Sequence, residues 1–241
     1  MTIETVLEAE DLTRHFGTRL AVDGIHFRLS RGEVLGLLGA NGAGKTTCLD
    51  MLGGVLGSTR GRVWVCGLDL DEVPEAAKRR LGYLPEQPPL YPEMRVGEYL
   101  TFAARLRGLG RYQAVPAVAA AMARCGLGGM ERRRLGQLSK GYRQRVGIAQ
   151  AIVHTPALVI LDEPTSGLDP LQSAEFIGLI QTLAQSAGVI FSTHRLAEAS
   201  ALCHRVLILQ GGRLAGEWLA GSPEGLASAF ATAQTPPEAI T

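Results

Sequence analysis

The sequence has little of several features that mark special classes of protein. Of its 241 residues, 4 are cysteine and 5% are aromatic, and 24 Lys and Arg nearly balance 23 Asp and Glu, leaving a net charge of +1. The cysteines are scattered without a C-x-x-C pair, which argues against a disulfide framework or a zinc site. The balanced charge points to no nucleic-acid partner, and we expect none.

Long apolar runs are missing as well. The most apolar stretches, residues 33–40 and 157–164, are interrupted by glycine, charge or proline well before the roughly 20 residues that span a bilayer. The first residues, "MTIETVLEAEDL", lack the basic patch and apolar core of a secretion signal. We therefore expect a cytoplasmic protein that crosses no membrane by itself.

The patterning that is present indicates an α/β fold. Residues 6–16 and 20–30 alternate apolar and polar positions, which predicts an antiparallel pair of strands that turns near Gly17 and Thr18. Further along, four short continuous apolar runs are separated by segments of helical length, as expected for parallel strands buried on both faces. These runs cover residues 34–38, 157–161, 188–192 and 205–209.

The strand pattern vanishes between about residues 88 and 156, where the sequence reads as helices. We expect a single domain over residues 1–228, with a helical subdomain at about 88–156 inserted in the sheet. Residues 229–241 are small, polar and proline-containing, and we expect them to form a flexible tail.

A glycine-rich stretch, "GANGAGKTT", lies where the apolar run 34–38 gives way to a helical pattern. It fits G-x-x-x-x-G-K-[ST], the loop that binds nucleoside triphosphates, in the strand-to-helix setting that this pattern requires. Backbone N–H groups would cradle the phosphates, Lys45 would neutralise β- and γ-phosphate oxygens, the Thr46 hydroxyl would bind Mg²⁺, and Thr47 would reach the α-phosphate. The predicted ATP-binding residues here are Gly39, Ala40, Asn41, Gly42, Ala43, Gly44, Lys45, Thr46 and Thr47.

Two acids follow the apolar run 157–161. Parallel strands end at one edge of a sheet, so Asp162 should point its carboxylate toward the phosphate loop. It is a candidate Mg²⁺ ligand through water, and Glu163 is a candidate for orienting or deprotonating the water that attacks the γ-phosphate. With the phosphate loop, these acids indicate a Mg²⁺-dependent nucleotide hydrolase or a nucleotide-dependent switch.

The order of further motifs narrows the class. After the phosphate loop come "LPEQ", "LSKGYRQR", "LVILDEP", "SGLD" and "STH", and in this order the chain resembles the ATP-binding-cassette (ABC) ATPases over about residues 5–228. The resemblance implies ATP hydrolysis and a P-loop NTPase core with a mostly parallel sheet. It also implies an N-terminal antiparallel β subdomain and an inserted α-helical subdomain.

In that family the signature motif of one subunit closes over ATP held by the phosphate loop of another. The resemblance therefore implies a head-to-tail dimer, in which Ser139 and Gly141 bind the partner copy's ATP and Asp169 contacts the opposite site. A serine hydroxyl and bare amides at a helix start suit an anion.

The resemblance assigns three more positions. Phe16 resembles the aromatic that stacks on adenine, with a core position on a strand face as the alternative. Gln87 resembles the glutamine that binds Mg²⁺ or its water, and His194 resembles the histidine that contacts the γ-phosphate and holds Glu163 and the water in line. Lys45, Glu163 and His194 are thus the predicted catalytic residues.

The signature departs from the commonest form, L-S-G-G-Q, because Lys140 and Tyr142 replace a glycine and the glutamine. This form resembles the ATPases of "ABC-2" type exporters. The resemblance implies that two copies bind a separate membrane permease from the cytoplasmic side and power transport, with export the expected direction.

The groove that receives the permease is expected to be lined by Leu90, Tyr91, Met94 and Val96; alternatively, these residues are only part of the core. A soluble ABC ATPase, or one that transmits force without passing a substrate, is the competing hypothesis.

Overall fold

The antiparallel pair predicted at the start of the chain is confirmed. The structure, a computed structural model, describes residues 4–220 and 223–234. β1 and β2 pair antiparallel around the expected turn, and two later strands extend the sheet in the order β2-β1-β4-β5. Its strands are β1 (Thr5–Phe16), β2 (Arg19–Ser30), β4 (Arg60–Val65) and β5 (Leu68–Asp69).

The second sheet has the order β10-β9-β3-β8-β7-β6, and all four predicted apolar runs are strands in it. Its strands pair in parallel except β10, which is antiparallel to β9. Sequence patterning missed β6, where Gly82 and Tyr83 interrupt the apolar run, and β10. The six strands are β3 (Val34–Leu38), β6 (Leu81–Leu84), β7 (Leu158–Leu161), β8 (Gly188–Thr193), β9 (Arg205–Gln210) and β10 (Arg213–Leu219).

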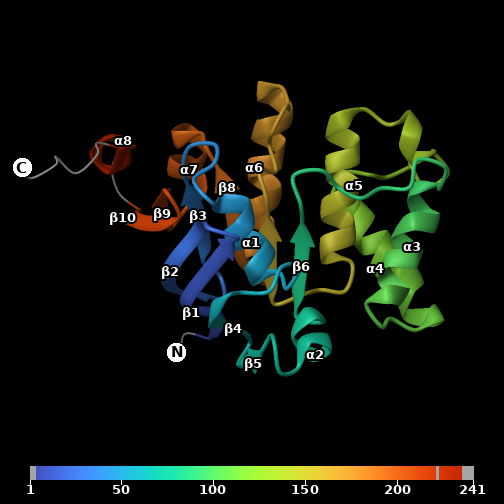
Figure 1. Cartoon of the computed structure of the whole chain (residues 1–241). Coiled ribbons are helices and arrows are strands. Elements are labelled where there is room, and N and C mark those ends of the chain that lie inside the picture. The colour runs from blue at the N-terminus through green and yellow to red at the C-terminus, as the bar shows by residue number, and fades with distance from the viewer. Residues whose placement is uncertain (1–3, 221–222, 235–241) are drawn as a thin grey trace, which may run out of the picture.

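Helices connect the parallel strands and cover them. Those around the sheets are α1 (Lys45–Leu52), α2 (Pro74–Lys78), α6 (Pro170–Ala184), α7 (Leu196–Leu202) and α8 (Pro223–Gln234). Between β6 and β7, where the strand pattern vanishes, the chain forms α3 (Val96–Leu106), α4 (Arg111–Arg124), the 3₁₀ turn η1 (Leu135–Gln137) and α5 (Lys140–Ile152). Figure 1 shows α3, α4 and α5 gathered beyond β6, on the side away from β9 and β10.

The C-terminal segment differs in part from the predicted tail. Residues 229–234, assigned to that tail, belong to α8, whereas residues 235–241 lie outside the described residues. The helix is rich in alanine, a strong helix former, and it is anchored by Leu226, which is fully buried.

The parallel sheet separates two apolar cores. Along β3 the side chains alternate: Leu35 and Leu37 face a core shared with α1 and the antiparallel sheet, whereas Val34 and Leu38 face a core shared with α5, α6 and the helical subdomain. Because side chains on both faces of the sheet are buried, the ends of β3, β7 and β8 are held in place at one edge of the sheet. The residues that follow these strands are therefore held in defined positions.

Within the described residues, no helix has the length and apolar character to cross a membrane. The four cysteines are free, as their spacing predicts.

Candidate active site

The loop of residues 39–44 joins β3 to α1, and its backbone requires glycine. Gly42 and Gly44 have φ angles of 81° and 104°, a left-handed region that residues with a side chain rarely adopt. A Cβ atom on Gly44 would lie 2.5 Å from the carbonyl oxygen of Ala21 in β2. The loop can therefore keep this shape and lie this close to β2 only with glycine at that position.

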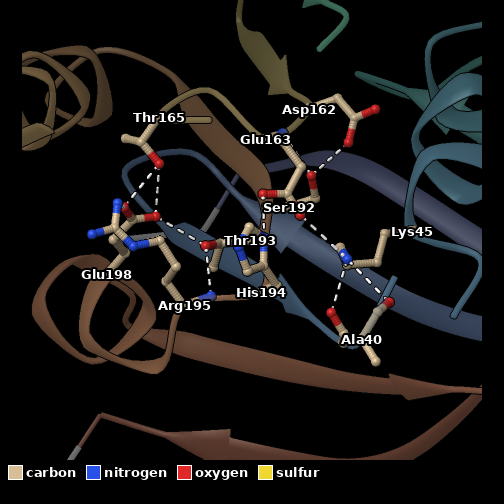
Figure 2. Close-up of polar contacts among 11 residues, drawn as sticks. Ala40, Lys45, Asp162, Glu163, Thr165, Ser192, Thr193, His194, Arg195 and Glu198 are labelled. Atoms are coloured by element: carbon tan, nitrogen blue, oxygen red, sulfur yellow. Dashed lines mark hydrogen bonds and ion pairs between the residues drawn. The ribbon is translucent and has the colours of Figure 1, made fainter. Parts of the chain in front are cut away.

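Lys45 begins α1 and turns its side chain back over the loop. Its side chain is only 6% exposed, and the amino group donates to the carbonyl oxygens of Gly39 at 2.8 Å and Ala40 at 3.3 Å. The same Nζ lies 3.2 Å from Oε1 of Glu163. A buried cation is thus held between the phosphate loop and the end of β7, as Figure 2 shows.

Asp162 follows β7 and is completely buried. Its Oδ1 accepts a hydrogen bond from Ser192 Oγ at 2.5 Å, whereas its Oδ2 has no hydrogen-bond partner among the described residues. Burial raises the pKa of this carboxyl, and the hydroxyls of Ser192 and Thr46 act in the opposite direction. Mg²⁺ prefers oxygen ligands, and the free Oδ2 of Asp162 and the Thr46 hydroxyl are two such oxygens. Asp162 and Thr46 therefore fit the predicted metal site.

Glu163 has a left-handed backbone, with a φ of 42°, which costs energy for a residue with a side chain. Its N–H donates to Ser192 Oγ at 2.8 Å, which helps to hold this conformation. The backbone turn directs the carboxylate between the other two predicted catalytic residues, since Oε2 lies 3.0 Å from Nδ1 of His194 and Oε1 faces Lys45. The structure thus brings together Lys45, Glu163 and His194, which come from α1 and from the ends of β7 and β8.

A cavity of about 660 Å³ opens over these residues. Phe16 lies on its wall and is 47% exposed, which favours a ligand-facing position over the core position considered above. The guanidinium of Arg14 lies 4.9 Å from the centre of the Phe16 ring. The lining residues are Phe16, Arg19, Leu20, Ala21, Asn41, Gly42, Gly44, Lys45, Thr46, Thr47, Glu86, Glu163, Ser166, His194, Gly211 and Gly212.

A larger cavity of about 940 Å³ lies at the opposite edge of the parallel sheet. Its walls include Arg80, Ala157 and Ala187, which directly precede β6, β7 and β8. The motif residues do not line it. The chemistry described above therefore belongs to the smaller cavity.

Outside the phosphate loop and the acid pair, four predicted site residues do not line the cavity of the same chain. Gln87 is exposed three residues beyond β6, and Glu86 lines the cavity in its neighbourhood. Ser139 caps α5 by accepting from the N–H of Tyr142 at 3.4 Å, and Asp169 caps α6. Gly141 is buried in α5, where a Cβ atom would lie 2.3 Å from Oε1 of Gln172.

Sequence reasoning missed a layer of polar residues behind the site. Ser192, which bridges Asp162 and Glu163, was assigned only to an apolar strand, although a lone serine in such a strand is a signal of a buried hydrogen bond. Thr165 and Glu198 also form buried hydrogen bonds there. No spacing rule connects these residues, because the contact joins segments about thirty positions apart.

Comparison with known proteins gives consistent results. Residues 22–166 match the family described as "ABC transporter". The chain is 38% identical to the "Uncharacterized ABC transporter ATP-binding protein YxlF" of Bacillus subtilis (strain 168), over 87% of this chain and 69% of that protein. It is 34% identical to "Nod factor export ATP-binding protein I" of Burkholderia thailandensis, over 91% of this chain and 72% of that protein.

A solved structure also matches nearly the whole fold. The protein titled "Structure of ATP binding subunit of ABC transporter" superposes with a TM-score of 0.83 and 30% identity, over 94% of this chain and 99% of that chain. The α/β architecture with two sheets is therefore that of an ABC ATPase cassette.

Proposed function

Because this chain belongs to the ABC transporter family as an ATP-binding, ATP-hydrolysing subunit, we propose that two copies enclose ATP in a head-to-tail dimer and power export through a separate membrane permease. The direction is supported by the 34% identical relative named for Nod factor export. The word "subunit" in the name of the similar structure supports a larger assembly. In this proposal the chain resides in the cytoplasm, held peripherally on the membrane by the permease.

The observation that carries the proposal is the row Lys45, Glu163, His194 along one wall of the cavity. Glu163 is the only carboxylate in this row and is almost buried, so it is suited to orienting water and accepting its proton. Lys45 binds phosphate oxygens, and His194 restrains the carboxylate and reaches the γ-phosphate. Asp162, Thr46 and the predicted Gln87 would hold Mg²⁺, which when bound neutralises phosphate charge.

The dimer is supported by where the remaining motif residues lie. Ser139 and Gly141 begin α5, and neither lines the cavity of its own chain. Asp169 likewise lies at the exposed start of α6. We assign all three to the site of a second copy, where the N–H groups at the start of α5 would face the γ-phosphate.

A second groove supports the permease contact. A cavity of about 690 Å³ runs along α3 and exposes Tyr91 (53% exposed), Phe102 (42%) and Leu106 (70%). Apolar side chains this exposed are suited to covering by a partner. Among the expected groove residues only Tyr91 lines the cavity; Val96 is fully buried because it begins α3 on the core side, and Leu90 and Met94 pack against the core.

The chemistry is tested by two variants at the cavity. Glu163→Gln should retain ATP binding, nearly stop turnover and accumulate an ATP-bound dimer on gel filtration, because the carboxylate that accepts the proton is gone. Lys45→Ala should instead weaken ATP binding in a filter-binding assay. ATP hydrolysis by Glu163→Gln at the parental rate would contradict the assignment of Glu163.

The permease contact needs a separate test. Phe102→Asp should reduce co-purification with a co-expressed permease and leave the basal ATPase rate unchanged, because a charge would enter the apolar groove. Tyr112, which is 91% exposed on α4 and outside the groove, supplies the matched control Tyr112→Asp. Equal co-purification of both variants would contradict docking at this groove.

A further inference from the structure

A buried acid that none of the nucleotide motifs includes lies behind the candidate active site. Glu198 in α7 is 5% exposed, and both of its carboxylate oxygens accept hydrogen bonds. Thr165 Oγ1 lies 2.8 Å from each oxygen, and Thr193 Oγ1 donates to Oε2 at 2.9 Å. Arg195 completes the set with an ion pair to Oε1 at 2.6 Å. Figure 2 shows these three residues converging on the carboxylate.

The partners of Glu198 are neighbours in sequence of the predicted catalytic residues. Thr165 lies two positions after Glu163, while Thr193 and Arg195 flank His194 on either side. One carboxylate therefore ties the segment that follows β7 to the segment that follows β8. The Glu163–His194 contact of 3.0 Å spans the same two segments.

Glu198 itself does not line the nucleotide cavity, and neither do its two threonine partners. Any effect on hydrolysis must therefore pass through the backbone of the two segments. The left-handed φ of Glu163 makes such restraint necessary, because a strained conformation persists only where the surroundings hold it. Ser192 holds the N–H of Glu163 on one side, and the Thr165–Glu198 hydrogen bonds hold the chain two residues later.

The charge of Glu198 suits this role. A carboxylate accepts from several donors at once, so it can bind both hydroxyls and the guanidinium together. Burial of an unpaired carboxylate is costly, and Arg195, whose side chain is 46% exposed, supplies the compensating cation. An apolar residue would fill the space but leave Thr165 and Thr193 as buried hydroxyls without this acceptor.

We propose that Glu198 is a positioning residue for ATP hydrolysis, which fixes the Glu163–His194 pair by joining the segments after β7 and β8. The inference rests on the proposed roles of those two residues. A displacement of about 1 Å at a reacting group can lower a rate by about 100-fold. Glu198→Ala should therefore lower kcat by about 10- to 100-fold and change KM for ATP by less than about twofold, since the phosphate loop is untouched.

The experiment measures kcat and KM for ATP on the purified full chain and on matched variants. Glu198→Gln keeps one of the two acceptor oxygens and should lose less of kcat than Glu198→Ala. Glu217→Ala is the control, because Glu217 pairs with Arg205 through an exposed ion pair on β10 and its removal should leave kcat unchanged. A kcat for Glu198→Ala equal to that of the control, or a loss of ATP binding that matches the loss of kcat, would overturn the proposal.

A double variant separates positioning from general loss of structure. If Glu198 acts through His194, the fold-loss of kcat in the double variant Glu198→Ala/His194→Ala should be smaller than the product of the two single fold-losses. If the two substitutions act independently, the fold-losses of kcat should multiply. Full multiplication would overturn the proposal. Should Glu198→Ala fail to fold, Thr165→Val and Thr193→Val each remove one hydroxyl without changing volume, and the same split between kcat and KM is expected of them.

Glu163→Gln, measured in the same series, keeps this inference separate from the proposed function. Turnover at the parental rate by Glu163→Gln would remove the assigned role of Glu163 itself. Loss of turnover in Glu163→Gln with normal kcat in Glu198→Ala would leave the proposed function intact and reject only the role of Glu198.

Discussion

Ser192 offers a quantitative test of how the site is built, through the substitution Ser192→Ala. The hydroxyl is fully buried, donates to Asp162 Oδ1 at 2.5 Å and accepts from the N–H of Glu163 at 2.8 Å. Its loss leaves a buried N–H without an acceptor, at about 1–3 kcal/mol, and removes a hydrogen bond to a carboxylate, at about 1.5–3 kcal/mol. The free energy of unfolding should therefore fall by about 2.5–6 kcal/mol.

Ser173 provides the matched control for this substitution. It is also a buried serine, 6% exposed, but its hydroxyl has no hydrogen-bond partner among the described residues. Ser173→Ala should therefore change the free energy of unfolding by less than about 0.5 kcal/mol or increase it, because no satisfied group loses its partner. Urea denaturation of the wild-type chain and both variants at pH 7 measures the difference.

A second readout links the same hydroxyl to chemistry. The Ser192 hydroxyl lowers the pKa of Asp162 against the larger effect of burial, so its removal should raise that pKa further. The acidic limb of the ATPase pH profile, measured with Mg²⁺, should then move to higher pH. Equal stability losses in Ser192→Ala and Ser173→Ala, with unchanged pH profiles, would refute the reasoning.

Three further predictions concern the nucleotide and metal sites. Gly44→Ala should lower ATP affinity at least about tenfold in calorimetry, because the φ of 104° at Gly44 and the nearby Ala21 oxygen force the loop to shift. Gly57→Ala should leave ATP affinity unchanged, because a Cβ atom there meets nothing within 4 Å. Phe16→Ala should weaken ATP binding by about 1–3 kcal/mol, and Phe16→Trp should retain it, since base stacking needs only an aromatic face; an unchanged Kd for Phe16→Ala would contradict this. The pKa of Asp162 is raised in the folded chain, so without metal its contribution to stability is present at low pH and is lost as the pH rises through that pKa. Mg²⁺ should therefore raise the Tm at pH 7, and EDTA should reverse the increase. An equal Mg²⁺ effect on the Tm of Asp162→Asn would count against the site.

Local rules were enough to predict the phosphate loop and six of the ten strands in the described part of the chain. Continuous apolar runs mark β3, β7, β8 and β9 because both faces of these strands are buried, and the glycine pattern marks the loop because its φ angles and its approach to β2 allow no other residue. Predictions failed where the apolar signal is interrupted or where tertiary packing decides. β6 reads Leu-Gly-Tyr-Leu, so Gly82 and Tyr83 interrupt its apolar run, and the face on which Val96 lies depends on how α3 packs.

The polar layer behind the site could not be predicted for a different reason. Ser192 and Glu198 act through partners about thirty positions away in sequence, and the sequence alone does not specify which strand ends become adjacent. The sequence motifs identify the residues that contact the ligand. The residues that support them, Ser192 and Glu198, are recognised only when the pairing of β7 with β8 is known.

The separation of the two cores by the parallel sheet has a consequence for how such a chain can diverge. The phosphate loop and α1 draw their support from one side of the sheet, and the groove along α3 draws its support from the other. Substitutions on the surface of α3 can thus accumulate without loosening the packing beneath the loop. The β-sheet in this way isolates the nucleotide site from changes at the surface of α3.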